Sequence, residues 1–332
     1  MISAPHSLYH LAPETNTFTH DTSIREAFSK RLAIRMVHYA SLVIICIFSR
    51  VGYGQSYEGL NELEGGNIKT YFSPGAADKA ERMATQLDRV IAFYDRHLGF
   101  TPSVSLLVLS EGDWSSFTSF PVYGMPHYTG DNVLIVAAED NQYWKSLIAR
   151  PDQMPEKYWK EFVKVYTNQE GELTMEPFFD LLVIHELGHA YHNQGGLVMQ
   201  RKWMGELFCN ILLHSYIAEN EPELLDALTS FPEMVVATTR RSALKYTTLP
   251  ELELNYNLIG RSYPQNYGWY QCRWHVAAAR IYDTSNMDGI RNLWHTLREH
   301  KDGLNDDEFV EILRTKVHES VAEVPLRWNE SE

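Results

Sequence analysis

Residues 178–192 read Phe-Phe-Asp-Leu-Leu-Val-Ile-His-Glu-Leu-Gly-His-Ala-Tyr-His, and they contain a His-Glu-x-x-His motif at 185–189. If this stretch is an α-helix, His185 and His189 are four residues apart and lie on one face. Two imidazoles in this arrangement can bind one Zn²⁺ through nitrogen. Glu186 then lies beside the ion rather than on it. From there a carboxylate can take a proton from a zinc-bound water.

The surroundings of the motif favour a buried helix. The residues directly before it are apolar apart from Asp180, which is not typical of a solvated loop. Gly195-Gly196 follows and is expected to end the helix. We therefore predict a helix over residues 175–194.

A third metal ligand is expected, because catalytic zinc sites commonly use three protein ligands and leave a fourth position for water. Glu206 lies 17 residues after His189, beyond the Gly-Gly turn. A helix over residues 201–219 could pack antiparallel to the first and return this carboxylate to the metal. The alternative is a surface glutamate. The apolar neighbours Met204 and Leu207 indicate a buried helix instead, where an unpaired carboxylate would be costly.

The pattern His185-Glu186-x-x-His189 followed by Trp203-x-x-Glu206 resembles the gluzincins. This group of zinc peptidases includes thermolysin and the M1 aminopeptidases. The resemblance implies a zincin-like fold in which His185, His189 and Glu206 hold Zn²⁺. It also implies that Glu186 is the general base.

The resemblance gives two further residues a supporting role. Trp203 matches a tryptophan that M1 enzymes carry three residues before the ligand glutamate. Asn210 matches a position where thermolysin-like enzymes have an acid that bonds a zinc histidine. Asn can accept such a bond, but it is a weaker orienting group. The alternative is that Asn210 is an ordinary polar helix residue.

The metzincin pattern is excluded, because it needs Gly where His192 stands and His where Gly195 stands. We interpret His192 as a cation near the helix C-terminus.

Peptide hydrolysis at such a site needs a donor for the developing oxyanion besides the metal. Gluzincins often use a Tyr or His well downstream, and in M1 enzymes the catalytic Tyr opens a late helix. Tyr267 lies at about the matching distance after Glu206, and Tyr270 follows one turn later. We expect Tyr267 to be the catalytic donor, with Tyr270 as second candidate. Aromatic core packing is the alternative for both.

The substrate backbone in this group pairs with an edge strand. The best candidate for this edge strand is the region from Gly124-Met125-Pro126-His127 through Val133. Pro126 suits an edge, because proline cannot donate to an inner ladder. We therefore expect Gly124, Met125 and His127 to bind substrate.

The remaining pattern predicts an α+β fold. Strands are expected over 67–73, 103–109 and 132–138, with a helix over 76–97. From about residue 141 the chain is expected to be almost all helix, with further candidates at 155–166, 221–240, 266–283, 287–300 and 305–316. We predict one catalytic unit over 55–332. It comprises a β-rich lobe over 60–140, which contains a small mixed sheet, and a mainly helical lobe over 141–325. The motif helix is expected to lie between the two lobes.

Residues 39–48 form an apolar run that is too short to span a bilayer, which takes about 20 residues. Its length is typical of a signal-peptide core, and small residues follow at 52–54. We predict a signal peptide over 36–54 within an N-terminal region 1–54. The mature protein is then exported, periplasmic or secreted, with no stable membrane span. A buried N-terminal helix or strand is the alternative.

Composition limits the partners. The chain is 44% hydrophobic and 22% charged, which is typical of a globular protein. A net charge of −14 argues against nucleic acid or an anionic membrane surface as main partner. Cys209 and Cys272 could pair in an oxidising compartment, but two buried free thiols are the favoured interpretation.

These observations predict an exported zinc metallopeptidase, a gluzincin-like hydrolase that cleaves a peptide or protein substrate through a zinc-bound water activated by Glu186. One alternative is a non-catalytic extracytoplasmic binding or scaffold protein on a zincin fold. Another is a zinc hydrolase of a non-peptide amide. Structural zinc sites are usually closed by four protein ligands, and no fourth ligand is evident here.

Overall fold

The computed structural model describes residues 57–148 and 150–330. The predicted signal peptide over 36–54 lies outside these residues. Among the described helices, none is both long enough and apolar enough to cross a bilayer. Cys209 and Cys272 are buried free thiols, as predicted.

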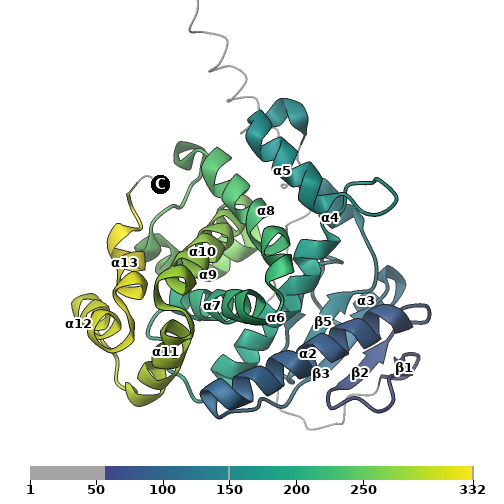
Figure 1. Ribbon diagram of the computed structural model, residues 1–332, viewed down its shortest axis with the longest axis horizontal. Coiled ribbons are helices and arrows are strands. Elements are labelled where there is room, and N and C mark those ends of the chain that lie inside the picture. The colour runs from purple at the N-terminus through teal and green to yellow at the C-terminus, as the bar shows by residue number, and fades with distance from the viewer. Residues whose placement is uncertain (1–56, 149, 331–332) are drawn as a thin grey trace, which may run out of the picture.

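A five-stranded mixed sheet forms the first part of the fold (Figure 1). Its spatial order is β1 (Asn61–Glu62), β2 (Lys69–Phe72), β3 (Ser105–Leu109), β5 (Val133–Ala137) and β4 (His127–Tyr128). The three central strands β2, β3 and β5 run parallel, and β1 and β4 pair antiparallel at the two edges. Every residue of β5 is buried, as expected for a strand covered on both faces.

Both faces of the sheet are covered by helices. α2 (Ala77–Leu98) connects β2 to β3 and packs on the face that carries Leu106 and Leu134. α3 (Glu111–Phe117) places Trp114 against the opposite face, beside Leu107 and Ile135. The alternation of buried residues along β3 therefore divides them between two separate clusters.

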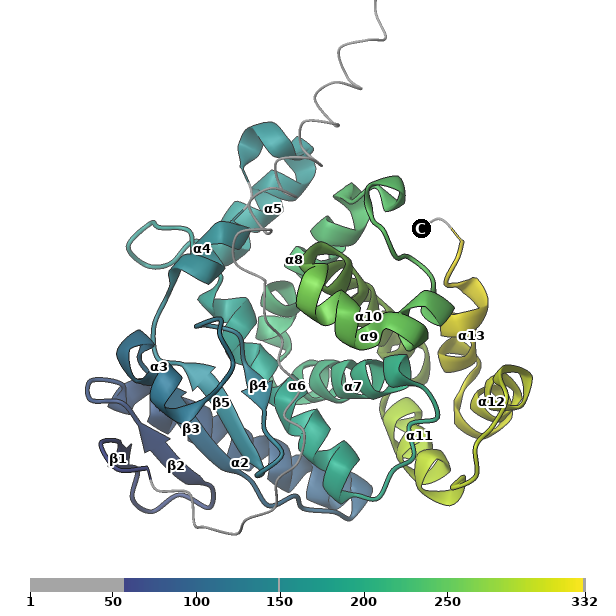
Figure 2. The same ribbon diagram turned by 180° about the vertical axis from the view of Figure 1, so that it is seen from behind.

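A mainly helical region follows the sheet, so the predicted α+β organisation is confirmed. It consists of α4 (Gln142–Leu147), α5 (Glu156–Tyr166), α6 (Glu176–Gln194), α7 (Lys202–Asn220), α8 (Leu225–Thr238), α9 (Leu249–Ser262), α10 (Pro264–Ser285), α11 (Met287–Glu299), α12 (Asp306–Ile312) and α13 (Glu319–Arg327). Short 3-10 turns at Pro151–Gln153, Pro222–Leu224 and Arg241–Ala243 and a π-helical turn at Leu313–Val317 complete it. α6 lies between the sheet and the other helices (Figures 1 and 2).

α9 was not predicted from the sequence, although its start carries a clear signal. The Thr248 hydroxyl accepts a hydrogen bond from the Glu251 N–H at 3.3 Å, and the Glu251 carboxylate accepts one from the Thr248 N–H at 3.0 Å. This reciprocal pair is a capping box, which satisfies two backbone donors at a helix start. The edge strand β1 was also missed, because it has only two residues. The edge strand β4 lies within the region 124–133 that was expected to form an edge strand.

The N-terminal turn of α6 is fixed to α2 by a buried cation. Lys79 is only 4% exposed, and its ammonium lies 2.9 Å from Glu176 and 2.8 Å from Asp180. The same ammonium lies 5.1 Å from the centre of the Trp144 ring. A buried cation needs such partners, because an unpaired one would be expensive. The motif helix is thereby held against the sheet lobe.

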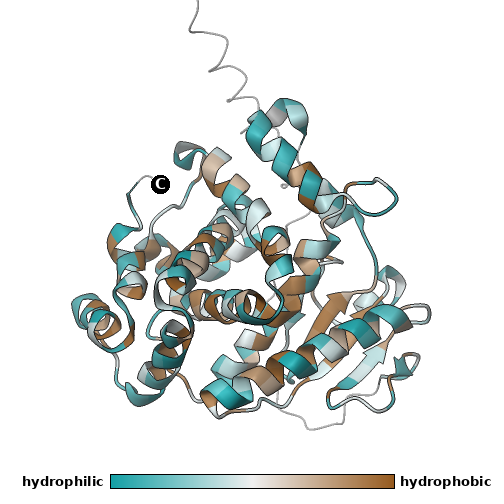
Figure 3. Ribbon diagram, in the orientation of Figure 1, coloured by the Kyte–Doolittle hydropathy of each residue, from teal (hydrophilic) through white to brown (hydrophobic). Residues whose placement is uncertain are grey.

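α7 crosses α6 at very short range. The two helices are rich in apolar residues in Figure 3, and α7 is buried without interruption from Trp203 to Ile217. A Cβ atom added at Gly188 would lie 2.9 Å from both Cα and Cβ of Cys209. Side chains do not tolerate such contacts with backbone. Glycine inside the motif is therefore what permits this crossing.

We expect Gly188→Ala to destabilise the fold by about 1–3 kcal/mol, because α7 would have to move away from α6. Gly205→Ala is a matched control on α7, since its Cβ would meet no side chain closer than 3.6 Å. The control should leave stability unchanged or raise it by up to about 1 kcal/mol. Urea unfolding monitored by circular dichroism measures both. Equal stability of the two variants would contradict the steric argument.

Candidate metal centre

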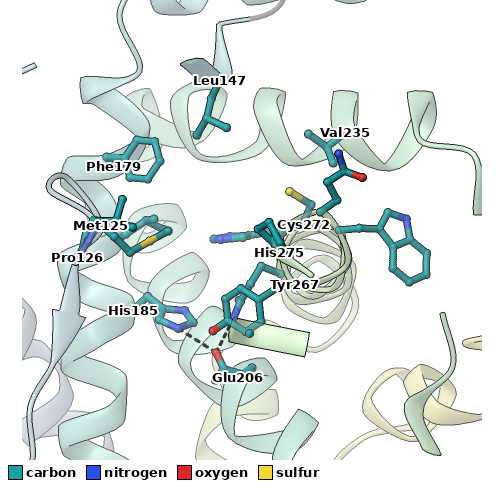
Figure 4. A pocket seen from close by; sticks show the side chains of 18 of the residues that line it. Met125, Pro126, Leu147, Phe179, His185, Glu206, Val235, Tyr267, Cys272 and His275 are labelled. Atoms are coloured by element: carbon teal, nitrogen blue, oxygen red, sulfur yellow. Dashed lines mark hydrogen bonds and ion pairs between the residues drawn. The ribbon is translucent and has the colours of Figure 1, made fainter. Parts of the chain in front are cut away.

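His185 and His189 on α6 and Glu206 on α7 come together where the two helices cross. Figure 4 shows His185 pointing toward Glu206. Glu206 Oε2 lies 3.3 Å from His185 Nε2 and 3.9 Å from His189 Nε2. Atoms bound at about 2.0–2.1 Å to one tetrahedral ion such as zinc are roughly 3.4 Å apart. The Glu206 carboxylate therefore lies near enough to each imidazole to share a metal ion with it.

A second donor set uses the same two histidines. His185, His189 and Cys209 offer ligand atoms that all lie within 4.8 Å of one another, and this group can hold a metal ion. Cys209 Sγ is 3.4 Å from His189 Nδ1, whereas the Nε2 atom of that ring faces Glu206. The sequence did not predict Cys209 as a donor. Its position on α7, three residues after Glu206, was the only signal for it.

The charges at the centre suit metal binding. Burial acts to raise the pKa of Glu206, but its hydrogen bond with His185 and the nearby imidazoles hold that pKa well below its usual range. Burial lowers the pKa of His189 to about 4, so this imidazole is neutral at pH 7. For His185 burial is outweighed by the carboxylates of Glu206 and Glu186, and its pKa is raised. Anionic carboxylates and neutral imidazoles are the forms that bind metals, so a metal ion would displace the His185 proton.

Glu186 lines the same cavity as the donor atoms. Burial raises its pKa to about 7, an effect that the His185 charge opposes and the Glu206 charge reinforces. The backbone of Tyr128 on edge strand β4 acts in the opposite direction and lowers the pKa. A carboxyl group with a pKa near neutrality can both accept and return a proton.

Both oxygens of Glu206 also receive hydrogen bonds from the helices behind it. The Tyr256 hydroxyl on α9 donates to Oε1, and Gln271 Nε2 on α10 donates to Oε2 at 2.8 Å. Gln271 Nε2 also lies 2.9 Å from the hydroxyl oxygen of Tyr267. Tyr256 and Gln271 were not predicted. The one available signal was Gln271's place four residues after Tyr267, on the same helix face.

The structure separates the two predicted tyrosines. Tyr267 lines the cavity and lies close to Glu206 in Figure 4. Tyr270 is fully buried, donates to the Thr248 carbonyl oxygen at 2.8 Å and stacks on Trp328 at 5.8 Å. A spacing of three residues turns Tyr270 into the core. The prediction of Tyr270 as an oxyanion donor is therefore wrong.

The two residues assigned a supporting role lie in different surroundings. Asn210 is fully buried, and its Nδ2 donates to the Glu206 carbonyl oxygen at 3.0 Å. Asn210 Oδ1 and His185 Nδ1 are both buried without another partner, and Asn210 is among the groups that raise the His185 pKa. Asn210 thus lies where it can accept the His185 N–H. The Trp203 ring packs against the Phe309 ring with 6.0 Å between the ring centres, and Trp203 does not line the cavity. Its observed contact is therefore core packing.

The predicted substrate segment lies beside the centre, in and before edge strand β4. Met125 and His127 line the cavity, but Gly124 does not. Gly124 has a φ of +95°, and its carbonyl oxygen accepts a hydrogen bond from the Trp144 indole at 2.6 Å. His127 is bonded through both ring nitrogens, to Thr118 Oγ1 at 2.8 Å and to the Met125 carbonyl oxygen at 3.0 Å. The hydrogen bonds of Gly124 and His127 therefore stabilise the loop. Met125 lines the cavity, and none of these bonds involves its side chain.

His192 lies in the last turn of α6, as predicted. Its ring is beside α7, where a Cβ at Gly205 would be 3.6 Å away. Burial lowers its pKa, which disfavours the positive charge that was predicted for it.

The candidate metal centre lines a cavity of about 530 Å³ that is bounded by α4, α6, α7, α8, α9, α10 and the segment around β4. Such a volume lies within the range of about 300–1,000 Å³ that small-molecule sites occupy.

Comparison of the chain with protein-family models and with curated protein sequences gives no match.

We expect Tyr256→Phe to weaken metal binding roughly tenfold, because groups that orient ligands typically contribute 10–100-fold to metal affinity. The variant leaves Glu206 Oε1 without its tyrosine donor. Tyr263→Phe is the control, since this hydroxyl bonds Lys245 and its residue does not line the cavity. Calorimetric titration with Zn²⁺ measures both variants. The same dissociation constant in Tyr256→Phe and the unaltered protein would show that Tyr256 does not position the carboxylate.

Proposed function

We propose that the chain is a zinc-dependent metallopeptidase of the gluzincin type, with a zincin-like fold. The observation that carries this proposal is the convergence of His185 Nε2 and His189 Nε2 on one oxygen of Glu206, next to Glu186, at the wall of a cavity. A site that stands beside a cavity has room for a substrate. The export of the protein belongs to the proposal and rests on the predicted signal peptide.

We take Glu206 rather than Cys209 as the third ligand. The Nε2 atoms of both histidines face Glu206, whereas Cys209 lies at the Nδ1 side of His189. In this assignment Cys209 contacts Nδ1 of the His189 ring. Nε2 on the other side of the ring is then available to bind the ion.

Different residues of the chain carry out different steps of the proposed peptide hydrolysis. When bound, Zn²⁺ would supply a Lewis acid and a water of lowered pKa. Glu186 takes a proton from the attacking water and returns it to the leaving amine. Tyr267 donates its hydroxyl hydrogen to the developing oxyanion, and Gln271 holds that hydroxyl in place.

Edge strand β4 supports a peptide as the substrate. It is the last strand in the sheet order and pairs only with β5, so its outer edge pairs with no other strand of the described chain. An extended peptide can add to such an edge through backbone hydrogen bonds. A purely structural metal would not need a neighbouring cavity or the retained Glu186. These features favour the peptidase over the scaffold and over a hydrolase of non-peptide amides.

Glu186→Gln should retain zinc but lower the turnover of a peptide library by about 10²–10⁴, the usual contribution of a general base. His189→Ala should lose both the metal and turnover. Metal content by atomic emission and cleavage by mass spectrometry separate the two effects. Undiminished cleavage by Glu186→Gln would refute the mechanism.

The ligand assignment can be tested on the protein with Co²⁺ in place of zinc. Glu206→Gln should weaken Co²⁺ binding at least tenfold, because it removes the anionic donor. Cys209→Ala should change it much less, and the Co²⁺ spectrum of the unaltered protein should lack a thiolate-to-metal charge-transfer band. A strong band that disappears in Cys209→Ala would instead assign the cysteine as ligand.

A further inference from the structure

The cavity beside the metal centre has mostly apolar walls. Its lining includes Phe178, Phe179 and Leu182 from α6, Phe231, Met234 and Val235 from α8, Tyr143 and Leu147 from α4, and Met125 from the segment before β4. In Figure 4, Met125, Phe179 and Leu147 lie on one side of the space, with Val235 and Cys272 on the other. A ligand body that fills this space gains free energy by leaving water, which favours large apolar side chains.

The charged residues along this lining are distributed unevenly. Among the described residues of the lining, the only carboxylates are Glu186 and Glu206, and both belong to the candidate metal centre. Away from the centre the only Lys, Arg, Asp or Glu residues in the lining are Arg240 and Arg261. The chain as a whole is strongly acidic, with a net charge of −14. The cavity therefore presents positive charge and no additional carboxylate for a substrate ammonium group.

Arg240 has an unusual environment for an arginine. It is half-buried just beyond the end of α8, and within the described chain no side-chain hydrogen bond, ion pair or ring contact involves its guanidinium. The next residue contrasts with it, because Arg241 donates to the carbonyl oxygens of Asn329 and Thr247 at 3.0 and 3.2 Å. Gln265 also lines the cavity, and its Nε2 is buried without an acceptor. Two donor groups on one cavity thus have no acceptor within residues 57–148 and 150–330.

We propose that this cavity binds a substrate with a large apolar side chain and a free carboxylate, and that Arg240 recognises the carboxylate. A guanidinium is always charged and can form two parallel hydrogen bonds to a carboxylate. The buried Gln265 Nε2 offers an additional donor to the carboxylate or to a neighbouring carbonyl. The inference rests on the proposed peptidase function and specifies its substrates: short peptides cleaved close to an apolar, unblocked C-terminus.

The test uses a matched pair of peptides, N-acetyl-Phe-Leu with a free carboxylate and the same peptide as its C-terminal amide. The metal-loaded protein should bind and cleave the free acid at least tenfold better, measured as kcat/KM and as the dissociation constant in Glu186→Gln. N-acetyl-Gly-Gly should be at least tenfold worse than N-acetyl-Phe-Leu, because it leaves the apolar walls unfilled.

Arg240→Gln should reduce the preference for the acid over the amide to near one, with little change for the amide. Arg298→Gln removes the same charge from an exposed position on α11 outside the cavity and should leave the preference intact. Equal use of acid and amide by the unaltered protein, or equal losses on both peptides in Arg240→Gln, would overturn the inference while leaving a peptidase. Arg240-dependent binding of the acid without any cleavage would uphold the carboxylate site and refute the peptidase.

Discussion

The close crossing of α6 and α7 is the constraint on which the candidate metal centre depends. The donor atoms come from two separate helices, so their spacing is set by how closely the two backbones approach. Gly188 faces the backbone of Cys209 at a distance that leaves no room for a Cβ atom. Movement of α7 away from α6 would carry Glu206 away from both histidines. The small residue within the motif is thus a packing requirement as well as part of the local sequence pattern.

The second constraint is the cost of burying a carboxylate. Glu206 is 5% exposed, and an ion removed from water costs several kcal/mol unless the protein satisfies it. Two imidazoles, the Tyr256 hydroxyl and the Gln271 amide surround it. α9 and α10 supply the last two groups from 50 and 65 positions away along the chain. The helical region is therefore organised around one buried anion as well as around its apolar core.

This organisation explains how much the sequence could predict. The motif helix, its end at Gly195 and the burial of α7 follow from local periodicity, and the structure confirms them. Tyr256 could not be found in this way, because its contact depends on how α9, bent at Asn255, packs against α7. Tyr270 was misjudged because a spacing of three residues in α10 places it in the core. Local patterns identify helices, but which side chains meet across helices is decided by tertiary packing.

Charge acts on two length scales in this protein. A net charge of −14 repels anionic ligands at long range, yet that field is screened beyond about 8 Å at physiological ionic strength. Inside a cavity the screening is weaker, so one half-buried guanidinium can outweigh distant surface carboxylates. Arg240 lies on such a wall with no partner from the described chain. An acidic protein can therefore select a carboxylate, because its local charge determines affinity and its net charge mainly slows the encounter.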